Sequence, residues 1–415
     1  MKSYQRIPTA LIVFCLAAQA WGAPAQEPPA SGAKGQEPPA CILGDQALSQ
    51  KQPDLAVIEY NKCLSKSPPT FKMLANLGIA YAQQKRFSEA IQAYGQALAL
   101  DPENANVLTN LGLAYMKTNR PKEASEQFAR SLMADPHDAK TLELLAYAHF
   151  DLGDYPLAGY EAGLVHQASP GDPTAAYILG ASYMRMGMNV KAIPLIDSSL
   201  SQVNSAEAYM ILGEALLGVK NWQGALQAFR KAEKMNPTLP GIYANLGAGL
   251  AAMAELDQAK AAFLKELARD PDNFKANYLL GQLDRVQGDN ADALKYLEKA
   301  NELQSDNPGP AYELSVLAVQ SAAETATTSA QLAQQYYQKA EASLESIVQK
   351  YPSLTDAHVL LAQVYFRLHK TEEATRERAI AAALQEADHA RLQAEGKSLK
   401  WLTGGKSAAQ APQNK

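Results

Sequence analysis

The sequence predicts an all-α protein, a solenoid of about ten antiparallel helix hairpins. Two observations carry this prediction. The pattern of small and apolar residues between positions 71 and 138 recurs after 34 residues, and each copy reads as two amphipathic helices. One hairpin cannot bury its apolar face alone, so consecutive copies are expected to stack. A chain of 415 residues is also too long for one ordinary globular core.

The two best copies share small, aromatic and closing proline residues at matching positions. The first contains Asn76-Leu77-Gly78, Tyr81, Ala90, Tyr94, Ala97 and Asp101-Pro102, and the second contains Asn110-Leu111-Gly112, Tyr115, Ala124, Phe128, Ser131 and Asp135-Pro136. This spaced pattern resembles the tetratricopeptide repeat. The resemblance covers about Pro39 to Gly396. It implies a right-handed superhelix whose first helices line a concave surface, in a family that binds peptides or protein segments and rarely catalyses a reaction.

The spacing inside one copy explains why it forms a hairpin. Leu77, Gly78 and Tyr81 share one face of a first helix, because they are spaced i, i+1 and i+4. The small Gly78 lets a second helix approach, and Tyr94 is expected to fill the wider end of the gap. Pro102 cannot continue the second helix.

The other copies are less regular but keep the period. The predicted array spans 39–395, with repeats near 37–70, 71–104, 105–138, 139–172, 173–205, 206–239, 240–273, 274–307, 308–354 and 355–395. The ninth copy is too long, which predicts extended helices around a lengthened turn near 321–336. The last second helix is expected to end at Gly396, and residues 396–415 to form a flexible tail.

The first 38 residues predict a processing segment and a spacer. Lys2 and Arg6 precede an apolar run from Ala10 to Ala18 that is too short to span a bilayer, and small residues follow. We interpret 1–23 as a secretory signal peptide, with an uncleaved anchor as the alternative. Residues 24–38 are rich in Pro and Gln and predict a disordered linker. The protein is therefore expected to be exported, either periplasmic or secreted, with no integral membrane span.

Export makes two cysteines of interest. Cys41 and Cys63 fall in the two helices of the first hairpin. In an oxidising compartment they could form a disulfide. The alternative is that they are two small buried residues.

Composition and motifs argue against several functions. The formal net charge of −5 and the absence of a concentrated basic face argue against nucleic-acid binding. No metal-binding, phosphate-binding or nucleophile motif is present. We therefore expect no catalytic residue, metal or cofactor, and predict that the protein is not an enzyme.

The candidate site is the concave groove. Asn76, Asn110 and Asn245 each precede a Leu-Gly pair, and an amide that both donates and accepts can bind an extended peptide backbone. In superhelical members of the family, asparagines at this place form such a ladder; here Leu or Ile interrupts it. Of the carboxylate-clamp pattern only Asn110 and Lys140 are in place, and Ala75, Ile79 and Leu144 break it. Helix geometry extends the lining to Gln83, Lys117, Tyr147, Asp151, Tyr177, Arg185, Tyr278, Gln282 and Arg285.

These features favour a non-catalytic scaffold or adaptor that binds a protein or peptide partner in the groove. One alternative is a structural or self-associating component of an envelope or secretion complex. Another is a subunit that presents substrates to an envelope enzyme. The ligand cannot be named from the fold.

Overall fold

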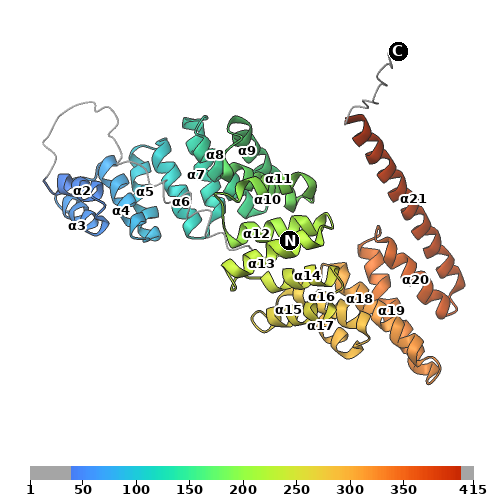
Figure 1. Ribbon diagram of the computed structural model, residues 1–415. Coiled ribbons are helices and arrows are strands. Elements are labelled where there is room, and N and C mark those ends of the chain that lie inside the picture. Colours follow the sequence, from blue (N-terminus) through green and yellow to red (C-terminus); the bar gives the residue numbers. More distant parts are fainter. Residues whose placement is uncertain (1–38, 403–415) are drawn as a thin grey trace, which may run out of the picture. The chain divides into compact units, whose positions relative to one another are not determined.

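A computed structural model describes the backbone of residues 39–402 and the side chains of residues 39–391, and within these residues it contains helices and no strand (Figure 1). The chain divides into two compact units, Met1–Gly249 and Leu250–Lys415, with the boundary inside α14 (Ile242–Ala252). The expected leader, the linker at 24–38 and residues 403–415 of the predicted tail lie outside the described residues.

The first unit is a row of helix hairpins. Its helices before α14 are α2 (Pro39–Ser49), α3 (Pro53–Leu64), α4 (Phe71–Gln83), α5 (Phe87–Leu100), α6 (Ala105–Lys117), α7 (Pro121–Ala134), α8 (Ala139–Leu152), α9 (Tyr155–Ala168), α10 (Pro173–Arg185), α11 (Asn189–Ser199), α12 (Ala206–Gly218) and α13 (Trp222–Met235). Each first helix packs on its second helix, and successive first helices from α2 to α12 also touch one another. This is the stacking that an isolated hairpin requires.

The second unit repeats the arrangement. Its helices are α15 (Leu256–Leu267), α16 (Phe274–Gln287), α17 (Asn290–Leu303), α18 (Pro308–Thr325), α19 (Ala330–Lys350), α20 (Thr355–Arg367) and α21 (Thr371–Leu402). Consecutive helices pack together, and α18 contacts both α16 and α20. The predicted all-α solenoid of hairpins is confirmed in both units.

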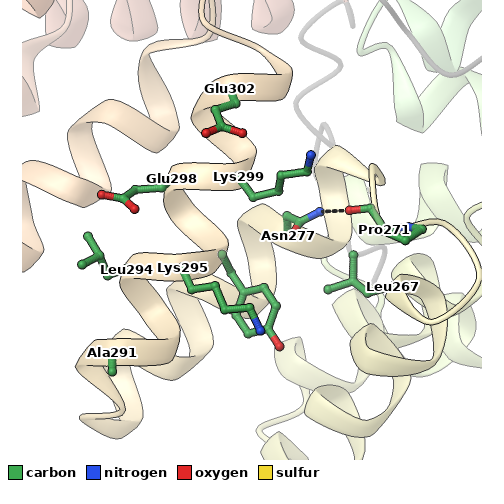
Figure 2. A pocket seen from close by; sticks show the side chains of 10 residues that line it. Leu267, Pro271, Asn277, Ala291, Leu294, Lys295, Glu298, Lys299 and Glu302 are labelled. Carbon is green, nitrogen blue, oxygen red and sulfur yellow. Dashed lines mark hydrogen bonds between the residues drawn. The ribbon is translucent and has the colours of Figure 1, made fainter.

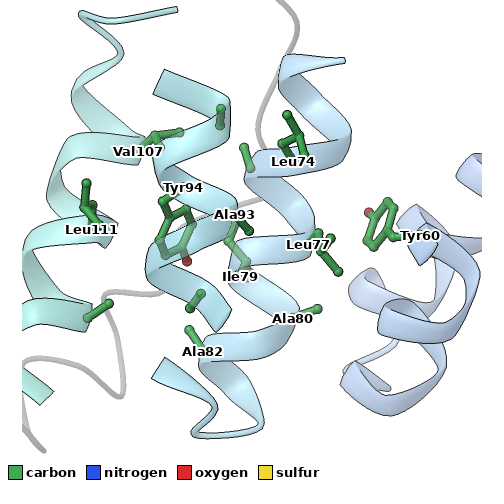
Figure 3. Packing of buried hydrophobic residues seen from close by; sticks show 14 of the residues in the cluster. Tyr60, Leu74, Leu77, Ile79, Ala80, Ala82, Ala93, Tyr94, Val107 and Leu111 are labelled. Atoms are coloured by element: carbon green, nitrogen blue, oxygen red, sulfur yellow. The ribbon is translucent and has the colours of Figure 1, made fainter. Parts of the chain in front are cut away.

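Close glycine–aromatic contacts join the two helices in several hairpins, at Gly44, Gly78, Gly112 and Gly213. The ring of Tyr94 lies so close to Gly78 that a Cβ added there would stand 2.5 Å from it. The ring of Tyr94 therefore lies at the point where the two helices approach each other, whereas the sequence analysis placed it at the wider end of the gap. Beside it, Leu77 and Tyr60 join the core that links the first two hairpins (Figure 3).

A hydrogen-bonded cap starts most first helices. The residue just before the helix accepts a hydrogen bond from a backbone N–H of the first turn, which satisfies one otherwise unpaired donor. These caps are Thr70, Asn104, Asp138, Asp172, Ser205, Asn273 and Asn307. The capping residues therefore recur with the repeat, as the apolar residues do.

The turn inside most hairpins uses one left-handed residue. Gly153, Gly187 and Gly288 fill it in three hairpins, whereas a residue with a side chain fills it in six others, among them Lys85 (φ 60°) and Lys220 (φ 61°). An L side chain is disfavoured in this conformation by roughly 1 kcal/mol, so the turns that lack glycine carry a small local strain.

The ninth repeat and the last helix differ in detail from the sequence prediction. In the ninth repeat α18 has 18 residues and α19 has 21, and a short connection at 326–329 joins them. The additional residues thus mainly extend the helices, and the turn is lengthened only slightly, to four residues where the other hairpins have two or three. Helix α21 continues past Gly396 to Leu402, where the sequence predicted an end at the glycine.

None of the helices in the described part of the chain is long and apolar enough to cross a membrane.

Candidate functional site: the surface of the first helices

All the predicted groove residues lie on first helices. They fall on α4 (Asn76, Gln83), α6 (Asn110, Lys117), α8 (Lys140, Tyr147, Asp151), α10 (Tyr177, Arg185), α14 (Asn245) and α16 (Tyr278, Gln282, Arg285). Residues three, four or seven positions apart share a helix face, so the helices present these side chains in short rows. Their burial and partners divide them into distinct groups.

Asn76 is fully buried and joins the first two repeats. Its Nδ2 donates to Oδ1 of Asp45 at 2.9 Å, and the hydroxyl of Tyr60 donates to the same oxygen at 2.5 Å. The ammonium of Lys72 lies 2.6 Å from the other carboxylate oxygen. One carboxylate on α2 thus binds groups from both α3 and α4, and the Asn76 donor is used inside the array.

Asn245 takes part in a second cluster of the same kind. Its Nδ2 donates to Oε1 of Glu214 at 3.2 Å, and Nη1 of Arg185 donates to Oε2 at 3.3 Å. Glu214 on α12 therefore connects α10 to α14 within the first unit. Hydrogen bonds to a charged group are worth about 1.5–3 kcal/mol, so this carboxylate is a substantial link between three repeats.

The second unit contains a third cluster around Glu313 on α18. Nε2 of Gln282 donates to its Oε1 at 2.7 Å, and Nε of Arg285 donates to its Oε2 at 2.9 Å. Gln282 also donates to the hydroxyl of Tyr278 at 3.1 Å. Burial and the nearby Glu313 carboxylate raise the pKa of Tyr278, so its hydroxyl keeps its proton.

One rule relates the three clusters. The residue just after the glycine of one repeat faces the residue two before the glycine of the next. It pairs Asp45 with Asn76, Glu214 with Asn245, and Gln282 with Glu313, where Ser315 replaces the glycine. We call these contacts the inter-repeat pairs. The sequence prediction named Asn76, Asn245 and Gln282 but missed their partners, although each pair is separated by 31 positions.

Asn110 breaks this rule because Ile79 occupies the facing position. Asn110 is buried, with 5% of its surface exposed, and makes no side-chain hydrogen bond within the described residues. It is not among the fully enclosed unpaired polar groups of the described chain, so its amide keeps access to solvent. Of the three asparagines, this is the one whose amide is not committed to a neighbouring repeat.

Charged and aromatic side chains lie at the ends of the neighbouring first helices. Gln83 is exposed and Lys117 is half-buried; burial first, and then the positive charge of Lys85, lower the pKa of the Lys117 ammonium. The guanidinium of Arg86 stacks over the ring of Tyr81 at 4.6 Å, and that of Arg120 over Tyr115 at 4.5 Å.

The α8 and α10 residues are more enclosed. Tyr147 and Tyr177 are buried, and Asp151 is half-buried. Burial, and then the charge of Glu207, raise the pKa of Tyr177 well above its usual range. These two rings pack in the core of the array.

A buried acid accompanies Lys140. The ammonium of Lys140 lies 3.7 Å from the carboxylate of Glu143, which sits inside the packing of α8. Burial, followed by repulsion from Asp172, raises the pKa of Glu143 to about 7. Glu143 is therefore poised between its neutral and charged forms near neutral pH.

Cys41 of α2 and Cys63 of α3 are joined by a disulfide, with Cα atoms 5.3 Å apart. The bond ties the two helices of the first hairpin, next to Met73 of α4. Because α2 has no hairpin before it in the described chain, this covalent link supplies restraint at the end of the array.

A shallow pocket of about 660 Å³ lies apart from these clusters, between α15, α16 and α17 (Figure 2). Lys295, Glu298 and Lys299 border it, and buried Asn277 donates to the carbonyl of Pro271 at 2.9 Å on its inner side. Its rim carries both signs of charge. Within the described residues, no three His, Cys, Asp or Glu side chains are grouped so that they could hold a metal ion.

The fold and this surface define a helical-repeat solenoid. Family models described as TPR repeat (78–119), Tetratricopeptide repeat (109–173 and 245–308) and Anaphase-promoting complex, cyclosome, subunit 3 (157–232) match the chain. The chain is a tetratricopeptide-repeat protein. Proteins built from these repeats generally mediate protein–protein interactions.

Several known proteins are similar to parts of the chain. BBSome complex member bbs-4 of Caenorhabditis elegans is 25% identical over 160 residues, which are 38% of this chain and 34% of that relative's length. The chain thus spans about a third of the length of this curated relative. Among solved structures, a tetratricopeptide repeat protein from Parabacteroides merdae has a TM-score of 0.45 at 16% identity, covering 59% of this chain and 96% of its own. Yeast Tom70 has a TM-score of 0.41 at 16% identity, covering 88% and 97%. YrrB, described as having an unusual peptide-binding site, has a TM-score of 0.38 at 19% identity, covering 47% and 97%.

Proposed function

We propose that the protein is a non-catalytic adaptor that binds an extended segment of a partner protein along the first helices α4 to α10. The observation that carries the proposal is the uncommitted amide of Asn110. An amide offers a donor and an acceptor, so one side chain can pair with both the N–H and the C=O of a peptide backbone, whatever the sequence of the peptide.

The neighbours of Asn110 define what such a segment would meet. Lys117 lies two turns further along the same face of α6, and the half-buried rings of Tyr81 and Tyr115 lie on α4 and α6. A cation beside apolar rings favours a segment that combines an acidic group with an aromatic or aliphatic anchor. The segment is expected to run across the helices and to contact several repeats at once.

The experiment begins with crosslinking capture of partners by the chain from residue 24 onward, followed by calorimetric titration of a peptide from the captured partner. Asn110→Ala is expected to raise the dissociation constant about tenfold, because roughly one good pair of hydrogen bonds is lost. Lys231→Ala, on second helix α13, is the control and should leave binding unchanged. A peptide that binds wild type and Asn110→Ala equally tightly would exclude this site.

We further propose that the protein is exported, with residues 1–23 removed. The Cys41–Cys63 disulfide supports this proposal, because such bonds persist in oxidising compartments. Cell fractionation and the mass of the native N-terminal peptide test it. A native chain that starts at Met1 and remains in the reducing cytoplasm would contradict it.

A further inference from the structure

The first helix of the array exposes a face that the first unit otherwise buries. Ile42 and Leu43 on α2 are 43% and 49% exposed. In the later repeats of the first unit, the two residues at the same position are at most 8% exposed; they are Asn76/Leu77, Asn110/Leu111, Leu144/Leu145, Ile178/Leu179, Ile211/Leu212 and Asn245/Leu246. In those repeats the pair packs against the preceding hairpin, whereas α2, among the helices of the described residues, packs against α3 and α4.

The exposed residues form one row on α2. Pro39, Ile42, Leu43 and Gln46 are all exposed and are spaced so that they share a side of the helix. We call this row the upstream face. The upstream face is a suitable surface for stacking helices, because the equivalent residues of the next repeats pack against the hairpin before them.

The charge of the upstream face determines which partner it can accept. It holds no charged residue, and the only charged side chain of α2, Asp45, is already bound to Tyr60, Asn76 and Lys72. Two identical faces can therefore meet without bringing like charges together. Gln46 adds an amide that can donate to and accept from its own copy across a two-fold axis.

The chain just before α2 offers little to cover this face. Residues 24–38 contain no Leu, Ile, Val, Met, Phe, Tyr or Trp. If export removes 1–23, as proposed above, the remaining chain has no apolar segment ahead of α2 to insert there. The hairpin is also tied by the Cys41–Cys63 disulfide, so it presents the face on a restrained helix.

We propose that the upstream face of α2 binds the same face of a second copy, so that two molecules associate end to end through their first repeats. The contact is isologous: Ile42 and Leu43 of one copy pack against the α2 row of the other, and the two helix stacks continue across the junction. Two large apolar side chains per copy make a small interface, so the dimer is expected to be weak and concentration-dependent.

Sedimentation equilibrium of residues 24–415 over a range of concentrations tests this. The weight-average mass should rise toward that of a dimer. Leu43→Glu should abolish the rise, because it places two carboxylates across the two-fold axis, and so should Leu43→Lys. An equimolar mixture of the two variants should restore association, since the charges then oppose each other.

Ile58→Glu is the matched control. Ile58 is similarly exposed, at 51%, but lies on α3, at a position where later repeats also expose their side chain. This variant should dimerise like the wild type, and far-UV circular dichroism should be unchanged in all variants. A chain that stays monomeric, a dimer that persists in Leu43→Glu, or association that appears only after residues 24–38 are removed would each overturn the proposal.

Discussion

The ring of Tyr94 rests on Gly78, so close that no side chain could fit between them. The same contact recurs at Gly112 with Phe128 and at Gly213 with Phe229. In these hairpins the glycine is required by an aromatic neighbour from the second helix and by no special backbone angle.

This contact predicts opposite results for two glycine substitutions. Gly78→Ala should destabilise the protein by about 1–3 kcal/mol, because the new methyl group overpacks the hairpin. Gly95→Ala, on the open side of α5 where a Cβ meets nothing within 4 Å, should stabilise it by up to about 1 kcal/mol. Urea unfolding followed by circular dichroism measures both. Equal effects of the two changes would show that packing against Tyr94 is not the cause.

Tyr60 and Tyr94 occupy equivalent positions but differ in their hydroxyl groups. The hydroxyl of Tyr60 donates to Asp45, whereas that of Tyr94 is enclosed and has no hydrogen-bond partner among the residues that the structure describes; burial raises the pKa of Tyr94 well above the usual range. Tyr60→Phe should therefore cost about 1–3 kcal/mol, and Tyr94→Phe should be neutral or stabilising by up to about 1 kcal/mol. Thermal melting of the two variants measures the difference, and a costly Tyr94→Phe would indicate a hydrogen bond at that hydroxyl.

Glu143 predicts a pH dependence of stability. Its pKa is raised from the ordinary 4.5 to about 7 in the folded protein, mainly by burial. Between these values the folded state holds the proton more tightly than the unfolded chain does, so the contribution of Glu143 to stability falls as the pH rises from 4.5 to 7. Glu143→Gln should remove this loss and stabilise the protein at pH 8 by about 1–2 kcal/mol relative to its effect at pH 4.5.

Urea unfolding at the two pH values measures this effect. Lys140→Gln is the companion variant, because Lys140 lies beside Glu143 and favours its charged form. It should enlarge the pH dependence of stability that Glu143→Gln abolishes. An identical pH dependence in wild type and Glu143→Gln would assign the effect to other groups.

Reduction of the disulfide should loosen one end of the array. A bridge across 22 positions contributes about 3 kcal/mol in the chain-entropy account. In a repeat array the loss is expected to stay near its origin, so α2 and α3 should fray while α6 to α10 keep their protection. Hydrogen exchange with and without reductant measures this. Uniform loss of protection across the first unit would contradict a local effect.

The left-handed turn at Lys220 offers a stabilising change. Lys220→Gly should increase the free energy of unfolding by about 0.5–1 kcal/mol, because glycine adopts a φ of 61° without a Cβ penalty. Lys339→Gly, in the interior of α19, is the control and should lower it by a similar amount. Denaturant midpoints compare them, and a destabilising Lys220→Gly would show that the lysine side chain matters more than the turn.

The sequence predicted the helices well because their signals are local. Gly78, Ala90 and Tyr94 lie within one hairpin, and their spacing defines the two packed faces. The length of the turn in the ninth repeat was not predictable, since Ala-, Thr- and Gln-rich residues fit either a loop or a longer helix. The continuation of α21 past Gly396 is similar: one glycine weakens a helix but does not end it.

The site was predictable only in part because its polar contacts cross between repeats. Asn76, Asn110 and Asn245 look alike in the sequence, and what separates them is the residue that faces each from the repeat before. Asp45 and Glu214 face two of them and Ile79 faces the third. Once that relationship is known, a position 31 residues upstream can be read directly from the sequence.

Because of the inter-repeat pairs, the repeats of this array differ in how many contacts would be lost if one of them were removed. Excision of residues 71–104 would bring Asp45 opposite Asn110 and preserve an amide for its carboxylate. Excision of 206–239 would instead bring Ala181 opposite Asn245 and leave both Arg185 and Asn245 without Glu214. Duplication and loss of repeats in such a protein are thus constrained by the residues that neighbouring repeats present to each other. The contacts between repeats limit its evolution as much as the structure of each hairpin does.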